Sequence, residues 1–369
     1  MAANTKSNKS FLTENSLRFF KTYINNPSPV GFESGGQKIW LHYINEYVDK
    51  HFIDPYGTAV GIINPDAKFK VVIEAHADEI SWFVNYITAD GLLYLKRNGG
   101  VDYQIAPAQR VIIHGKKGPV KAVFGWPAIH TRLGNPDQKE PQPKADNLWL
   151  DCGARNKKEV EALGVHIGAV VTYQEGFDEL ANGFYVGRAF DNRVGGFMIA
   201  EVARLLKENK RKLPYSLYVV NAVQEEIGLR GAEMIARRIK PDIAIITDVT
   251  HDTTTPLINK NIEGDVQCGK GPSLSYAPAV HNKLLSIVEK IAAGKKIPVQ
   301  WRALSRSTGT DTDSFAYAND GCPSVLISMP LRYMHTTVEM IHKDDIENTI
   351  RLMYETLLTL TPKTNLSYL

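Results

Sequence analysis

The sequence contains little cysteine and no apolar run long enough to cross a bilayer. Its three cysteines, Cys152, Cys268 and Cys322, are far apart, and no two have zinc-ribbon or redox spacing. This spacing argues against a disulfide framework and favours a reducing compartment. A membrane span needs ~20 consecutive apolar residues, and the polar stretch Met1–Phe20 lacks the apolar segment of a secretory signal. We predict a cytoplasmic protein without a membrane partner.

The sequence also has no excess of one charge. Its 43 Lys and Arg residues nearly balance its 40 Asp and Glu residues, which gives a formal net charge of +3. No basic run is comparable with a nucleic-acid-binding arm, so we predict no nucleic-acid partner. With 43% hydrophobic residues, the 369-residue chain can bury a sizeable interior, and its length favours two domains.

Helical patterns and apolar runs alternate in the first and last parts of the chain. The run Val71–Ile73 suits a strand that is buried on both faces, and so do Leu217–Val223 and Ile243–Thr247. Helical spacing surrounds these runs. The alternation predicts an α/β layered domain with a central mixed sheet flanked by helices.

The middle of the chain has a different pattern. It contains two hairpin patterns, the first formed by Trp82–Ile87 and Leu92–Leu95. We therefore predict a small β-rich, barrel-like inserted domain at residues 80–179. The main α/β domain is then discontinuous and comprises residues 1–79 and 180–369.

Acidic residues and histidines gather where the predicted strands end. In open α/β sheets, ligands bind in the crevice beyond the carboxyl ends of the strands. Segments far apart in the sequence therefore deliver side chains of metal-ligand type to one edge. The residues concerned are His76, Asp78, Asp191, Glu225, Glu226, Asp248 and His335.

His76 and Asp78 are two residues apart, so on a strand they face the same way. Asp78 can then bind the ring nitrogen of His76 that is not used for a metal, which fixes the tautomer of the ring. The plainer interpretation of this pair is a solvated strand end.

Glu225 and Glu226 follow the apolar run Leu217–Val223 closely. One carboxylate could bind a metal while the other takes a proton from water, because a general base must lie near the water without being held on the metal. The plainer interpretation is a pair of exposed charges.

The remaining candidates also have plainer interpretations. Asp191 could be a helix N-cap, Asp248 a turn residue, and His335 an ordinary core or surface histidine. His251 is three residues from Asp248 and stays open as a ligand, and His281 is a weaker candidate.

The combination of these residues is more specific than its parts. Two histidines and three carboxylates provide nitrogen and oxygen ligands suited to zinc, cobalt or manganese. The three negative charges oppose the four positive charges of two divalent ions, and a bridging hydroxide would restore the balance. We therefore predict two divalent metal ions per subunit, a bridged hydroxide as nucleophile and Glu225 as general base. The predicted ligands are His76, Asp191, Glu226, Asp248 and His335.

Six short motifs of the chain also occur, in the same order, in a known family. The motifs are Ala75-His-Ala-Asp-Glu79, Ala189-Phe-Asp-Asn-Arg193, Gln224-Glu-Glu-Ile-Gly228, Thr247-Asp-Val-Thr-His251, Thr308-Gly-Thr-Asp311 and Pro330-Leu-Arg-Tyr-Met-His335. With them the sequence resembles the tetrahedral aminopeptidases, which include glutamyl and deblocking aminopeptidases and belong to the co-catalytic dinuclear metallopeptidases. The resemblance covers about Ser10 to Leu358, and its last motif is highly specific.

The resemblance implies a place for each predicted ligand. Asp191 would be the carboxylate that bridges both metal ions. His76 and Asp248 would complete one metal site, and Glu226 and His335 would complete the other.

The resemblance also implies that Glu225 is the general base and that Asp78 orients His76. The insert resembles the dimerisation domain of the family, whose members assemble dimers into a hollow tetrahedral dodecamer that admits only peptides. Ser81 and Trp82 stand where relatives often carry Gly and Phe. We expect this departure to affect assembly more than chemistry.

The main domain is thus expected to be catalytic, in a metal-dependent aminopeptidase that removes the N-terminal residue of peptides. A related deacylase or carboxypeptidase that uses the same metals is the nearest alternative. A glycoside hydrolase of the endoglucanase kind fits less well, because its paired carboxyls stand ~5–9.5 Å apart and need no metal. A metal-free assembly module fits least, because every matching ligand position is filled.

Three further residues are candidate substrate contacts, namely Arg332, Gly309 and Asp311. They lie in or near motifs shared with the family, and each could equally brace the site. The sequence alone does not indicate which N-terminal side chain is preferred.

Overall fold

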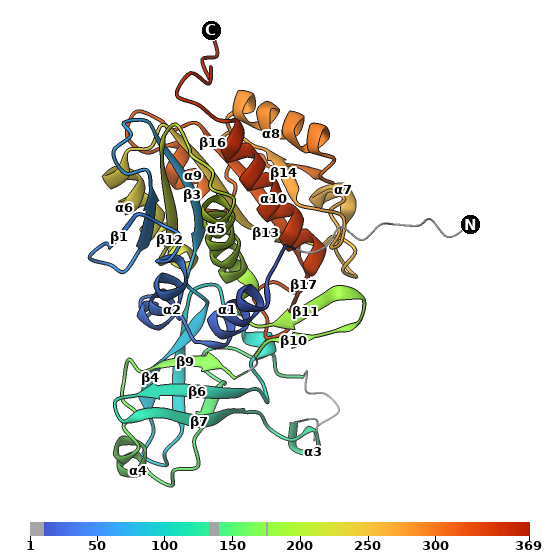
Figure 1. The fold of residues 1–369 in the computed structure, drawn as a ribbon. Coiled ribbons are helices and arrows are strands. Elements are labelled where there is room, and N and C mark those ends of the chain that lie inside the picture. Colours follow the sequence, from blue (N-terminus) through green and yellow to red (C-terminus); the bar gives the residue numbers. More distant parts are fainter. Residues whose placement is uncertain (1–10, 133–139, 175) are drawn as a thin grey trace.

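The computed structural model describes residues 11–132, 140–174 and 176–369. Residues 1–10 of the predicted main domain, and residues 133–139 and 175 of the predicted insert, lie outside this part of the chain. Figure 1 shows a layered α/β region above a smaller β-barrel region.

The α/β region is built on an eight-stranded mixed sheet (Figure 1). Strands β12, β3, β13 and β16 lie side by side and run parallel to one another. Strands β2 and β14 pair antiparallel with the two outer members of this group. In spatial order the strands are β1 (Lys50–Ile53), β2 (Ala59–Ile63), β12 (Ser216–Ala222), β3 (Lys70–His76), β13 (Ile243–His251), β16 (Ser324–Leu331), β14 (Ser273–Tyr276) and β15 (Gln300–Ala303).

The four parallel strands are apolar because both faces of the sheet are covered. Nearly every residue in them is buried. β-Branched residues such as Val71, Val72 and Ile73 pack well on a pleated surface, so the apolar run that they form becomes a central strand.

Helices cover the two faces of the sheet. Helices α5 and α10 cross its front in Figure 1, with α1 and α2 packed beside α5, and α6 and α9 cover the opposite face. Thr13 starts α1 by accepting a hydrogen bond from the Ser16 amide. The helices of this region are α1 (Glu14–Asn25), α2 (Ser34–Ile44), α5 (Phe190–Glu208), α6 (Arg230–Ile239), α7 (Lys260–Glu263), α8 (Asn282–Lys295), α9 (Thr312–Ala316) and α10 (Lys343–Thr359).

The insert forms a closed antiparallel barrel with an apolar core of its own. Leu93, Val111 and Leu150 are fully buried inside it, and closure removes the exposed strand edges that an open sheet would leave. Around the barrel the strands are β4 (Ser81–Ile87), β5 (Leu93–Asn98), β8 (Trp149–Asp151), β7 (Gly118–Gly125), β6 (Arg110–Gly115) and β9 (Val170–Tyr173). The insert also contains η1 (Tyr103–Ile105), α3 (Ile129–Arg132) and α4 (Lys157–Ala162).

A small three-stranded sheet, which the sequence pattern did not indicate, lies between the two regions. Its strands are too short for a clear alternation of polar and apolar residues. They are β10 (Asp178–Glu179), β11 (Phe184–Gly187) and β17 (Glu339–His342), and the nearby single-turn helices are η2 (Ala181–Gly183) and η3 (Glu225–Ile227).

These observations confirm the predicted fold class, a mixed α/β sheet flanked by helices and interrupted by a barrel. The division into residues 1–79 with 180–369 and residues 80–179 stays a prediction. In the part of the chain that the structure describes, no helix is both long and apolar enough to cross a bilayer.

Candidate metal centre

The carboxyl ends of the four parallel strands meet at the edge of the sheet that faces the barrel (Figure 1). His76 is the last residue of β3, and Asp248 lies near the end of β13. Glu225 and Glu226 lie in η3, just after β12, and His335 follows β16. The parallel topology therefore brings these five side chains to one place.

Asp191 reaches the same edge from the start of α5. Its backbone is not helical (φ −74°, ψ 115°), and the N-cap position is occupied by Ala189. Oδ1 of Asp191 lies 3.2 Å from Nε2 of His76, and Oδ2 lies 3.3 Å from Nε2 of His335. The helix-capping alternative for Asp191 does not hold, because the carboxylate lies between two histidines.

Two groups of ligand-type atoms share Asp191. One contains His76, Asp191 and Asp248, and the other contains Asp191, Glu226 and His335; within each group the atoms lie within 4.8 Å of one another. Nε2 of His76 is 3.9 Å from Oδ1 of Asp248, and Nε2 of His335 is 3.3 Å from Oε2 of Glu226. The structure thus brings all the predicted ligands together.

The donor atoms of both groups fit divalent ions. Nitrogen and oxygen ligands bind zinc at ~2.0–2.2 Å in a tetrahedral arrangement, which separates two ligands of one ion by about 3.4 Å. The distances from Nε2 of each histidine to the carboxylate oxygens of its group range from 3.2 to 3.9 Å. Imidazole and carboxylate also suit cobalt and manganese. Each group could therefore hold one ion, with Asp191 common to both.

Glu225 lies beside this pair of groups. It can also be grouped with His76 and Glu226, and its Oε2 is 3.8 Å from Nε2 of His76. Nε2 of His76 can bind only one ion, and its shorter contact is with Asp191. Glu225 therefore lies directly beside the two groups that share Asp191.

Asp78 connects His76 to the turn that carries both glutamates. Its Oδ1 accepts a hydrogen bond from the Glu225 amide at 3.0 Å, and its Oδ2 accepts one from the Glu226 amide at 3.1 Å. Oδ1 also lies 3.4 Å from Nδ1 of His76. The fully buried Asp78 can thus orient His76 so that Nε2 faces the candidate ion.

Glu339, which sequence reasoning missed, holds the backbone of two candidate ligands. Its Oε1 accepts a hydrogen bond from the His335 amide at 2.8 Å, and its Oε2 accepts one from the Asp191 amide at 3.0 Å. His335 has a positive φ of 61°, which is uncommon for a residue other than glycine. An acid four residues after His335 was the available signal, but it lies in the unpredicted strand β17.

The crowding of buried acids changes the pKa values at the site. Burial, together with the nearby Asp311 and Asp248 carboxylates, raises the pKa of Glu225, and burial also raises the pKa of Asp248 itself. Burial alone would lower the pKa of His335, but hydrogen bonds with Asp191 and Glu226 raise this pKa to about 12. Asp248 and His335 therefore favour their protonated forms, and divalent ions would displace these protons because metal ligands must be deprotonated.

A cavity of about 300 Å³ opens beside the two groups, and Gly309 is among its lining residues. Asp311 is not among them, because it is only 1% exposed and lies against Glu74. Arg332 does not line the cavity either, because its Nε donates a hydrogen bond to Oδ2 of Asp252 at 2.7 Å. Substrate contact by these residues stays a prediction, and Arg332 braces a neighbouring loop.

The two histidines that the sequence left open are both located. His251 lines the cavity but belongs to neither group of candidate ligands. His281 is the N-cap of α8, where Nδ1 accepts a hydrogen bond from the Leu284 amide at 3.4 Å, and its ring stacks on Tyr368.

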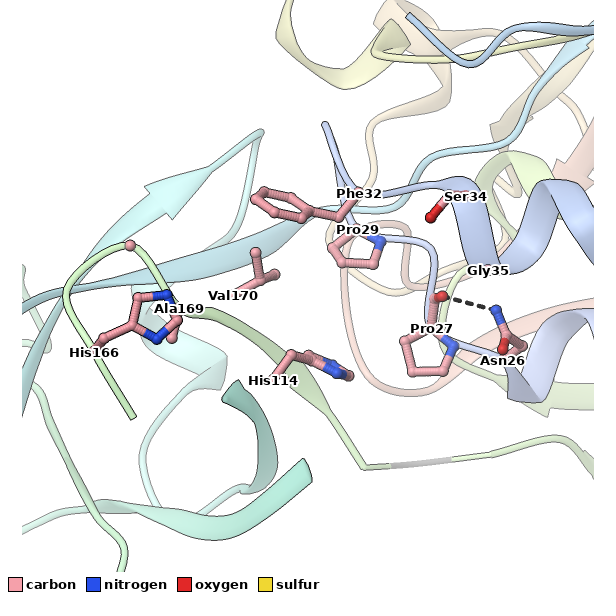
Figure 2. Close-up of a pocket in the computed structure, with 11 residues that line it drawn as sticks. Asn26, Pro27, Pro29, Phe32, Ser34, Gly35, His114, His166, Ala169 and Val170 are labelled. Atoms are coloured by element: carbon pink, nitrogen blue, oxygen red, sulfur yellow. Dashed lines mark hydrogen bonds between the residues drawn. The ribbon is translucent and has the colours of Figure 1, made fainter. Parts of the chain in front are cut away.

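A second cavity, of about 350 Å³, lies between the segment after α1 and the barrel (Figure 2). Each of the two histidines that line this cavity already has a polar partner within the barrel. Nε2 of His114 lies 3.0 Å from Oγ1 of Thr172, and Nδ1 of His166 lies 3.3 Å from the Gly164 carbonyl oxygen. None of the described residues that line it is a carboxylate, so it does not resemble the first site.

The geometry of the candidate metal centre agrees with the similarity of the chain to known proteins. Residues 57–352 match the family model of the M42 glutamyl aminopeptidases. The chain belongs to this family. The M42 chain is 31% identical to the lysyl aminopeptidase of Pyrococcus furiosus over 345 residues, which cover 93% of this chain and 96% of the relative. It is thus a peptide hydrolase of an aminopeptidase family.

Solved structures share the fold of this M42 chain. A TET aminopeptidase from a marine sediment archaeon of the Thaumarchaeota has a TM-score of 0.89 at 30% identity, covering 95% of this chain and 98% of that one. The TET1 peptidase of Pyrococcus horikoshii, which can assemble into a tetrahedron or a large octahedral shell, has a TM-score of 0.82 at 25% identity, covering 94% and 100%. The predicted family is therefore confirmed.

Proposed function

We propose that this protein is a metal-dependent aminopeptidase that hydrolyses the N-terminal peptide bond of peptides. Two divalent ions would be held by two ligand groups, His76 with Asp248 and Glu226 with His335, joined by the shared Asp191. The observation that carries the proposal is the position of the Asp191 carboxylate, whose two oxygens face the Nε2 atoms of different histidines at 3.2 and 3.3 Å. Zinc, cobalt and manganese all suit these ligands.

The side chains around the ligands have distinct parts in the proposed reaction. Divalent ions bound here supply Lewis-acid polarisation of a carbonyl and lower the pKa of water. Glu225 takes a proton from the attacking water and passes it to the leaving amine, because it lies 3.8 Å from His76 and is not needed as a ligand. Asp78 holds the tautomer of His76 and the position of the Glu225 amide.

Peptide hydrolysis with and without metal tests the proposal. Removal of metals with a chelator is expected to abolish release of the first residue, and zinc, cobalt or manganese is expected to restore it. A panel of peptides with free or acylated amino termini and with free or blocked carboxyl termini separates an aminopeptidase from a deacylase or carboxypeptidase. Chelator-resistant activity, on peptides or on a β-glucan, would contradict the proposal.

We further propose that the barrel at residues 80–179 mediates dimerisation and that dimers assemble into a tetrahedral dodecamer in the cytoplasm. The TET peptidases that share the fold support the assembly, and the described cysteines, all free thiols, support a reducing compartment. Light scattering of the purified protein tests the assembly, and a monomer at working concentration would contradict it.

A further inference from the structure

The backbone of the barrel region reaches a candidate ligand at Gly100. Nδ1 of His335 lies 3.2 Å from the carbonyl oxygen of Gly100, a residue of the insert that follows β5. When Nδ1 carries the proton and donates it to this carbonyl, Nε2 keeps its lone pair. Nε2 is the atom that faces Asp191 and Glu226, at 3.3 Å from each.

The barrel approaches the site so closely that a side chain at position 100 would crowd His335. A Cβ atom on Gly100 would lie 3.0 Å from both Nδ1 and Cε1 of His335. At Gly99 the backbone φ is +90°, and a Cβ atom would lie 3.4 Å from Cβ of Glu226. The Gly99–Gly100 segment is therefore packed directly against two candidate ligands.

The same segment is fixed to the α/β region by Asn98. This side chain is 7% exposed, and its Nδ2 donates hydrogen bonds to the Val30 carbonyl at 2.9 Å and to Oγ of Ser81 at 2.8 Å. The Val30 amide in turn donates to the Glu79 carbonyl at 3.1 Å. The position of Gly100 relative to His335 is therefore set by contacts from both regions.

The two histidines of the site are oriented in different ways. His76 is 1% exposed and faces the carboxylate of Asp78 at Nδ1, within the α/β region. The His335 side chain is 31% exposed, and its Nδ1 faces the neutral carbonyl of Gly100 in the insert. Ligand histidines depend on such a partner to fix the tautomer and the ring orientation.

We propose that Gly100 is a positioning residue through which the inserted barrel sets the geometry of the ion site formed by Asp191, Glu226 and His335. The site formed by His76, Asp191 and Asp248 is independent of this contact. This inference rests on the proposed function, because it requires that the two groups bind ions. It assigns to the insert a part in ion binding in addition to any part in assembly.

Titration of the metal-free full-length protein with Co²⁺, followed by calorimetry and by the visible absorption of the bound ion, tests the inference. In Gly100→Ala the new methyl group displaces the His335 ring, and the affinity for one of the two ions is expected to fall about 10–100-fold while the other changes less than about twofold. Gly294→Ala is the matched control, because a Cβ atom there meets nothing within 4 Å. It is expected to bind both ions as the wild type does.

Three results would overturn the inference. If the wild type binds two ions and a folded Gly100→Ala protein binds both with unchanged affinity, the positioning role of Gly100 is contradicted and the proposed function is not. Wild type that binds no Co²⁺ contradicts the proposed function and this inference with it. If Gly100→Ala does not fold, Asn98→Ala replaces it. Loss of the Asn98 hydrogen bonds should also lower the affinity for one ion by about tenfold. Unchanged affinity for both ions in Asn98→Ala contradicts the inference equally.

Discussion

The eight-stranded sheet and the barrel both enclose apolar cores, but their contributions to the candidate site differ. The sheet delivers side chains at the carboxyl ends of parallel strands, such as His76 on β3 and Asp248 on β13. The barrel is antiparallel, so neighbouring strands end at opposite rims, and it contributes the Gly100 carbonyl. Parallel topology gathers functional groups from distant segments, whereas the closed barrel supports them from outside.

The largest expected effect is a loss of turnover that follows substitution in the α/β region but not in the barrel. Glu225→Gln in the α/β region should lower kcat by about 10²–10⁴-fold, since a general base contributes that much, while the ion content stays unchanged. The control is Glu161→Gln on the exposed surface of α4 in the barrel, which should leave kcat unchanged. Peptide hydrolysis and metal analysis measure both, and near-normal turnover of Glu225→Gln would exclude Glu225 as the base.

The next effect is a loss of stability when a leucine is truncated in either of the two apolar cores. Leu150 in the barrel and Leu217 in the sheet are both fully buried, and truncation of either to alanine should cost about 2–5 kcal/mol. Hydrogen exchange should show that Leu150→Ala weakens protection mainly in the barrel and Leu217→Ala mainly in the sheet. If each substitution lowered protection equally in both regions, the cores would not be independent.

Lowering the pH should weaken ion binding without loosening the barrel. The pKa of His335 is raised to about 12 and that of His76 is raised well above its ordinary value, because carboxylates surround both rings despite their burial. An ion must therefore displace protons, and each displaced proton lowers the apparent affinity about tenfold for every pH unit of acidification. Co²⁺ titrations between about pH 6 and pH 8 measure this slope, and an affinity independent of pH would be inconsistent with histidine ligands.

The smallest expected effect on turnover is that of Arg332→Ala. Its loss leaves Asp252, which is fully buried, without its cationic partner, so the free energy of unfolding should fall by about 1–3 kcal/mol. Because Arg332 does not line the cavity, KM should change little. A large rise in KM without a loss of stability would restore Arg332 as a substrate contact.

Much of this architecture is predictable from the sequence, because apolar runs and the acids that follow them carry strong local signals. The strands near Val71, Leu217 and Ile243 and the gathering of ligand-type residues at their ends are of this kind. A backbone carbonyl such as that of Gly100 carries no side-chain signal at all. The burial of Asp311 beside Glu74 depends on packing that no local pattern encodes.

The central claim is that the α/β region holds two ions around Asp191. Anomalous diffraction from crystals of the protein grown with zinc tests it most directly. Two peaks per chain are expected, one beside His76 and Asp248 and the other beside Glu226 and His335, with the Asp191 carboxylate between them. No peak at this edge of the sheet, or peaks remote from Asp191, would contradict the account.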